Sequence, residues 1–313
     1  MASPPVIAVI GSLNTDLVMY TPYVPRGGET MTGHSFHTGL GGKGANQAVA
    51  CAKLSRKKDL SEGTAIVRML GAVGNDANGA DMLKGLAGYG VESSGVKVAD
   101  SVSTGVAIIL VEDSGENRIM LSPGANYTVK PEEFAAGFPG PKPSLVIMQL
   151  EIPLETVLQC MQTAKREGVP VLLNPAPAQK IPVEYYKDLA YLVVNETEAM
   201  MLSDCDENDV KTEEGLQRVA GIFKGYGVRN VLITLGGSGV FYSAEDGAQG
   251  LVPAEKAKVV DTTAAGDTFV AAYALEIIKG NTTEQAVRIA NKAAAKTVEK
   301  KGAQESIPWL DEL

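Results

Sequence analysis

The sequence has few cysteines and no long apolar run, and each shortage excludes a class of protein. Its three cysteines, Cys51, Cys160 and Cys205, are scattered along 313 residues without a CxxC pair. We therefore expect reduced thiols in an intracellular protein rather than a disulfide framework. No stretch approaches the ~20 apolar residues of a membrane span, and the start lacks the basic segment of a signal peptide. These absences predict a cytoplasmic protein without membrane contact, with nuclear presence left open.

Basic charge is also in short supply. The formal net charge is -9 and the isoelectric point is about 4.9. Broad affinity for nucleic acid needs a basic face that displaces counterions, so we expect no nucleic-acid partner. A negatively charged cofactor could still bind, but backbone amides and bound cations would have to hold it.

The composition of the chain is that of a globular protein with a substantial hydrophobic core. It is 45% hydrophobic and 21% charged, and short β-branched runs alternate with amphipathic helical patterns. Repeated βα units imply a mostly parallel sheet with helices on both faces, that is, a three-layer αβα sandwich. The runs that predict buried strands are Val6–Gly11, Ser144–Glu151, Val169–Pro175, Leu189–Glu196 and Asn230–Gly237.

Two segments do not follow this rhythm. Residues 17–40 and 104–121 alternate in strand fashion around glycine-containing turns, which predicts a small β-sheet projecting from the body. The segment could be a plain edge extension, but its closeness to candidate site residues favours a lid or a dimer contact. The main α/β domain would then comprise residues 1–16, 41–103 and 122–313.

Parallel sheets bind ligands beyond the carboxyl ends of their strands, so polar residues there are candidates. Any single one is more often a cap or turn residue, but the whole set at one edge is harder to dismiss. These candidates are Asn14, Asp16, Glu151, Asn174, Asn195, Glu198, Thr234, Gly236, Asp261 and Asp267.

The stretch "DTTAAGDTF" raises the sharpest question. Asp267 follows Ala264, Ala265 and Gly266 where a helix begins, and it could be a simple N-cap. The amides of residues 264–267 would also suit an anion, and small side chains let a phosphoryl group approach them. Because capping would not require three small residues before the aspartate, we interpret Asp267 as a general base beside an anion site.

Two motifs near the N-terminus point to a polar ligand. "GLGGKG" formally matches the dinucleotide fingerprint, but it does not follow the first strand, and Ala45 stands where a Walker A loop needs lysine. It is better interpreted as a glycine-rich helix entry that presents Lys43 and Asn46. In "GSLNTD", a buried Asp16 could accept hydrogen bonds from two neighbouring hydroxyls of a ligand, although the residues Asn14 and Asp16 alone favour an Asx turn.

Two later motifs are less specific. "NETE" places Asn195 and Glu198 near the first turn of one helix. The two acids of the motif could complement the helix dipole or organise magnesium and its waters, and the residues alone do not decide. "TLGGSG" could bring amides and the Thr234 hydroxyl to a phosphate, but tight hairpins look the same.

In order and spacing, "GGKGANQA", "NETEA", "TLGGSGV" and "DTTAAGDTF" resemble the ribokinase-like (PfkB) carbohydrate kinases over nearly the entire chain. The resemblance implies ATP-dependent phosphorylation of D-ribose at its 5-hydroxyl, with Asp267 as base and an anion hole at 264–267. The implied sugar ligands are Asn14, Asp16, Gly42, Lys43, Asn46 and Glu151. The implied nucleotide and magnesium residues are Asn195, Glu198, Thr234, Gly236, Gly239, Gly266 and Asn291.

The resemblance further implies activation by a monovalent cation, usually potassium, and a homodimer formed through the lids. The implied cation ligands are the Asp261 carboxylate, the carbonyls of Thr263, Thr297, Lys300 and Gly302, and the Ser306 hydroxyl. The segment before Gly302 would otherwise be a plain helix C-terminus that ends at this glycine. Alternatives are a related kinase for fructose, deoxyribose or adenosine, or a non-catalytic sugar-binding protein.

Overall fold

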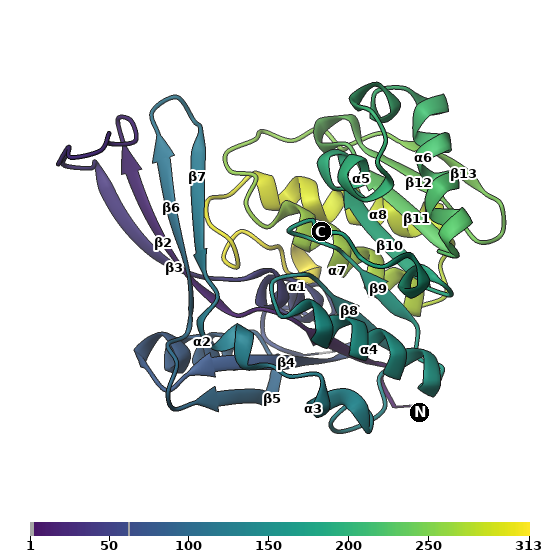
Figure 1. Ribbon diagram of the computed structural model, residues 1–313, viewed down its shortest axis with the longest axis horizontal. Helices are drawn as coiled ribbons and strands as arrows, with labels where there is room; N and C mark the ends of the chain where they lie inside the picture. The colour runs from purple at the N-terminus through teal and green to yellow at the C-terminus, as the bar shows by residue number, and fades with distance from the viewer. Residues whose placement is uncertain (1–2, 62) are drawn as a thin grey trace.

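The computed structural model describes residues 3–61 and 63–313; residues 1, 2 and 62, which fall in the expected main domain, lie outside the described residues. In these ranges nine strands form one sheet, the large sheet (Figure 1). Neighbouring strands are parallel except at one edge, where β11–β12 and β12–β13 are antiparallel. In spatial order the strands are β13 (Gln249–Val252), β12 (Val240–Ser243), β11 (Asn230–Thr234), β10 (Tyr191–Asn195), β9 (Val171–Leu173), β8 (Leu145–Met148), β1 (Val6–Ile10), β4 (Ile66–Gly74) and β5 (Glu92–Ala99).

Helices cover both faces of the large sheet, as the sequence predicted. Successive residues of β1 point to opposite faces: Ile7 and Val9 join one buried cluster and Ala8 and Ile10 the other. Buried residues of α1, α2, α7 and α8 belong to the first cluster, and buried residues of α3 to α6 belong to the second. The helices are α1 (Lys43–Leu54), α2 (Ala77–Gly88), α3 (Glu132–Ala135), α4 (Leu154–Glu167), α5 (Glu196–Ser203), α6 (Glu213–Tyr226), α7 (Ala265–Ile278) and α8 (Thr283–Val298). None of the helices in the described ranges is long and apolar enough to cross a membrane.

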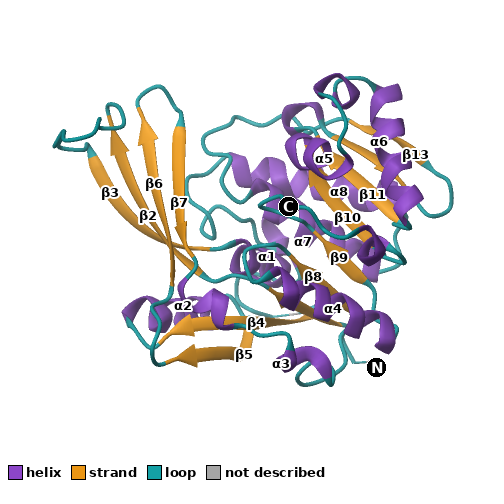
Figure 2. Ribbon diagram, in the orientation of Figure 1, coloured by secondary structure: helices purple, strands orange, loops and turns teal. Residues whose placement is uncertain are grey.

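A second sheet, the small sheet, stands beside the large one (Figure 2). Among the described residues it has four strands, in the order β3-β2-β6-β7. Its first strand begins at Asn14 and not near residue 17, and β3 continues to Gly41. The end of the small sheet next to the large sheet, which we call its root, therefore contains Asn14 and Asp16, two of the candidate site residues. Its strands are β2 (Asn14–Thr21), β3 (Ser35–Gly41), β6 (Gly105–Glu112) and β7 (Asn117–Ser122).

The small sheet carries apolar side chains that its own residues do not cover. β7 is exposed along its entire length. The exposed apolar side chains of its strands include Phe36, Ile108, Ile119, Met120 and Leu121.

Candidate active site

Asp267 lies buried in the first turn of α7, with a fractional exposure of 8%. The helix is entered through Ala264, whose φ of 61° is left-handed, a conformation that is costly for a residue with a Cβ. Asn46 donates to Oδ2 of Asp267 at 3.1 Å, and Gln47 donates to Oδ1 at 2.9 Å. The carboxylate is thus fixed by two amides from the start of α1, and not by the cap of its own helix.

The electrostatics of Asp267 balance burial against nearby donors. Burial raises its pKa above the ordinary value, while Lys43 and the hydrogen bonds from Gln47 and Asn46 act against that rise. For Lys43, burial alone would lower the pKa, but Asp267, Glu151 and Glu198 raise it on balance. Lys43 therefore stays protonated within a field of three carboxylates.

The glycine-rich turn before α1 packs against the end of β1. Gly42 has a φ of 87°, and a Cβ there would lie 2.7 Å from the Asn14 nitrogen, so only glycine fits. Glu151 holds this turn: its Oε2 accepts from the Lys43 amide at 3.0 Å and from the Ser12 hydroxyl at 2.5 Å. Glu151 lies at the expected place, but this oxygen is engaged by the protein itself.

Asn14 and Asp16 lie in strand β2, so the Asx turn that these residues alone favoured is wrong. Their backbones pair with Gly41 and Gly39 of β3, and this ladder overrides the local turn preference. The Asp16 carboxylate lies over Gly41, where a Cβ would approach within 2.2 Å. Burial, followed by the nearby Glu151 and Asp267, raises the pKa of Asp16 to about 7.

Asn126 is a site residue that the sequence reasoning missed. It is 1% exposed, accepts from the Leu13 amide at 2.9 Å and donates to Asn14 Oδ1 at 2.7 Å. Because it follows β7, it ties the exit of the small sheet to the entry. Ser12, Gln47 and Gln149 were missed too. Of these, Gln47 had a signal, since it directly follows Asn46.

For Asn195 and Glu198 the structure shows a cap. Asn195 Oδ1 accepts from the Glu198 amide at 2.8 Å, and Glu198 Oε2 accepts from the Asn195 amide at 2.9 Å, a capping box at the start of α5. Burial raises the pKa of Glu198. The magnesium role of Glu198 remains a prediction.

The turn after β11 lies at the carboxyl end of its strand, next to the carboxyl end of β10. Thr234 ends the strand, and its hydroxyl donates to the Val194 carbonyl at 3.4 Å. Gly236 and Gly239 both have left-handed φ, of 52° and 106°. A Cβ at Gly239 would lie 2.1 Å from the Val252 oxygen, so this glycine is required by packing whatever the turn binds.

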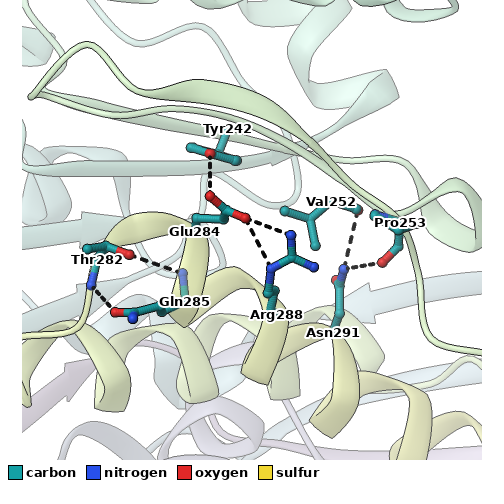
Figure 3. A network of polar contacts seen from close by, with 8 residues as sticks. All are labelled: Tyr242, Val252, Pro253, Thr282, Glu284, Gln285, Arg288 and Asn291. Atoms are coloured by element: carbon teal, nitrogen blue, oxygen red, sulfur yellow. Dashed lines mark hydrogen bonds and ion pairs between the residues drawn. The ribbon is translucent and has the colours of Figure 1, made fainter.

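Asn291 lies on α8, facing the segment that follows β13 (Figure 3). Its amide nitrogen donates to the carbonyl of Pro253 at 3.0 Å and of Val252 at 3.5 Å. One turn earlier, Arg288 pairs with Glu284 at 2.6 Å. A cavity of about 410 Å³ is lined by residues 252–256 and Arg288, and Asn291 bonds to two of the carbonyls in that segment without lining the cavity itself.

The proposed cation ligands lie in two segments, one around Asp261 and one from the end of α8 onward, that hydrogen bonds connect. Asp261 Oδ1 accepts from Thr263, and Oδ2 accepts from the Gly302 amide at 3.0 Å. Although burial raises it, these hydrogen bonds hold the pKa of Asp261 below its ordinary value. The Ser306 hydroxyl donates to the Ala303 carbonyl. The helix expected to end at Gly302 in fact ends at Val298, because the chain turns there to reach Asp261.

The three-layer fold with its small sheet places the chain in the class of α/β proteins with the ribokinase-like fold. The model of the pfkB family of carbohydrate kinases matches residues 5–310. The chain belongs to that family.

Individual relatives cover nearly the whole chain. Ribokinase of Schizosaccharomyces pombe is 47% identical over 98% of this chain and 96% of its own. Deoxyribokinase of Salmonella typhimurium is 36% identical, covering 98% and 97%. The structure of Arabidopsis thaliana ribokinase complexed with ribose and ATP superposes with a TM-score of 0.86 at 30% identity, covering 99% of this chain and 97% of that one.

Proposed function

We propose that this protein is a ribokinase, which transfers the γ-phosphoryl group of ATP to the 5-hydroxyl of D-ribose. Support comes from the relatives named ribokinase and from the neighbour that holds ribose and ATP. The single observation that carries the mechanism is Asp267: it is buried, held on both oxygens by α1 amides, and placed at the N-terminus of α7.

In the proposed reaction the oxygen of the sugar 5-hydroxyl attacks the γ-phosphorus, and Asp267 accepts the proton of that hydroxyl. The bond to the bridging oxygen breaks, and ADP leaves. The amides of residues 264–267 stabilise the charge on the transferring group. The sugar is held by residues at the root of the small sheet, around the start of α1 and after β8: Asn14, Asp16, Gly42, Lys43, Asn46 and Glu151.

The nucleotide side is assigned to the other strand ends of the same edge. Thr234, Gly236, Gly239 and Gly266 would line the phosphates, with Asn195 near them and Asn291 near the base. Glu198 would hold magnesium through water, and the metal would neutralise phosphate charge. The oxygen donors around Asp261, namely the carbonyls of Thr263, Thr297, Lys300 and Gly302 with the Ser306 hydroxyl, suit potassium, which would buttress the turn before α7.

We further propose that residues 17–40 and 104–121 form a lid over the sugar and that two lids pair in a homodimer. The exposed apolar side chains of β7 support this, since isolated monomers seldom leave such a surface uncovered. The three cysteines are free, which agrees with a cytoplasmic location.

The specific alternative is deoxyribose, because a relative named deoxyribokinase is 36% identical. Fructose and adenosine are weaker candidates, and the intact Asp267 argues against a non-catalytic protein. ADP formation measured with each of these acceptors at fixed ATP, magnesium and potassium decides. We expect the highest kcat/KM with ribose; a higher value with deoxyribose would reassign the substrate, and no turnover despite ribose binding would refute a kinase.

A further inference from the structure

Gln47 is a fully buried side chain whose amide is engaged at both ends. It is 0% exposed and lies one residue beyond Asn46 on α1. Its nitrogen donates to Asp267 Oδ1 at 2.9 Å and to Asn174 Oδ1 at 3.0 Å. Its oxygen accepts from Gln149 at 2.6 Å. Both of its N–H donors and one lone pair of its oxygen are therefore directed at three specific side chains.

The direction of the Gln47 amide is dictated by the strands beneath it. Asn174 follows β9 and donates its own nitrogen to the Val193 carbonyl of β10 at 3.0 Å, so it presents an oxygen to Gln47. A flipped Gln47 would place its oxygen against both that oxygen and the Asp267 carboxylate. The backbone of the large sheet thus sets the direction of the Gln47 amide, whose nitrogen faces Asn174 and Asp267.

This arrangement acts on the ionised form of the carboxylate. Gln47 donates to one oxygen of Asp267 and Asn46 to the other, so both oxygens are acceptors. Protonation of either oxygen makes it a weaker acceptor for the amide that donates to it, because hydrogen bonds to an ionised acceptor are the stronger ones. Hydrogen bonds to the charged form favour that form, and they oppose the burial that raises the pKa of Asp267.

A structural role alone does not explain this glutamine. The buried residues three or four positions from it on α1 include the small residues Gly44, Ala50 and Cys51. Burying an amide costs free energy that a methionine would not incur. The buried amide of Gln47 points to a functional role because it donates to the ionisable carboxylate of Asp267.

We propose that Gln47 is a positioning residue that keeps Asp267 ionised and aimed, without touching the sugar itself. This inference rests on the proposed role of Asp267 as general base. The base must be ionised to work, so activity rises as pH rises through its pKa. Loss of the Gln47 donor raises that pKa, and the acid limb of the pH–rate profile moves to higher pH.

The test is the pH dependence of kcat, from pH 5 to 9, for Gln47→Met and Gln47→Glu with saturating ATP and ribose. Methionine removes the donor. Glutamate keeps the shape but forms a coupled carboxyl pair with Asp267, which is a second route to the same shift. Gln162→Met, an exposed glutamine on α4, is the matched control. Thermal melting and ribose binding report folding.

We expect both Gln47 variants to shift the acid limb upward by roughly one pH unit, a tenfold change in the ionisation constant, with the KM for ribose changed less than threefold. The control should coincide with wild type. A limb that stays in place, or a fall in kcat that is uniform across pH, overturns the inference. If Asp267→Asn is inactive but the acid limb of the Gln47 variants does not move, only the inference about Gln47 fails. If Asp267→Asn is active, the proposed base itself is wrong.

Discussion

The side-chain nitrogen of Asn46 lies 3.1 Å from Oδ2 of Asp267, although 221 positions separate the two residues. This hydrogen bond joins the first turn of α1 to the N-terminus of α7. The proposed sugar side and the proposed base are therefore one hydrogen-bonded unit. A substitution at either end should be felt at the other.

The proton balance of Asp16 predicts a stability effect. Burial raises its pKa to about 7, so the folded protein binds a proton that the unfolded chain has released between pH 4 and 7. The Asp16 contribution to stability is thus present at low pH and lost as pH rises towards 7. We expect Asp16→Asn without sugar to be more stable than wild type at pH 8, by up to a few kcal/mol.

Thermal or urea unfolding at pH 5 and pH 8 checks this. The difference between variant and wild type should be larger at pH 8 than at pH 5. An equal difference at the two pH values would show that Asp16 does not bind the extra proton.

Asn126 predicts a coupled loss of stability and sugar affinity. Asn126→Ala removes the bonds to Leu13 and Asn14 and leaves buried groups unpaired, which costs about 1–3 kcal/mol. Because Asn14 loses its fixed orientation, the KM for ribose should rise more than kcat falls. The exposed Asn75→Ala, which removes a bond to Asp100, is the control. An unchanged KM in a destabilised Asn126→Ala would mean that Asn126 only supports the fold.

Lys53 predicts a pH-dependent fluorescence signal. It is 3% exposed, its amino group lies 5.3 Å from the ring centres of both Tyr89 and Trp309, and burial lowers its pKa to about 8. Glu312, Lys300, Glu305 and Lys58 are the charged groups that face it. Trp309 is the single tryptophan, so its emission reports the loss of the ammonium.

We expect the wild-type emission to titrate with a midpoint near pH 8 between pH 6.5 and 9.5. Lys53→Met should give a flat response over that range. A Lys53→Met variant that titrates like wild type would assign the signal to another group.

Much of the fold follows from the sequence because parallel strands are buried on both faces and appear as continuous β-branched runs. β1 and β8 to β11 were predicted in this way. β4 was not, since Arg68 and Gly71 interrupt its apolar pattern. Arg68 is buried nonetheless, because its guanidinium donates to the Pro139 carbonyl at 2.5 Å. Such a distant partner leaves no local signal.

The site divides in the same way. Glycine-rich turns and Asp267 carry local patterns, so the sequence identifies them. Ser12, Gln149 and Asn126 act through partners more than a hundred positions away, and an isolated polar residue has no periodicity to reveal that. Asn14 and Asp16 were identified as residues but placed in a turn, because the pairing of β2 with β3 is decided by tertiary structure.

The most direct test of the account is ribose-dependent ADP formation by wild type and Asp267→Asn, with the exposed Asp246→Asn as control. The account predicts that Asp267→Asn folds and binds ribose but loses roughly 10²–10⁴ in kcat, while the control matches wild type. Turnover by Asp267→Asn within a few-fold of wild type would contradict it.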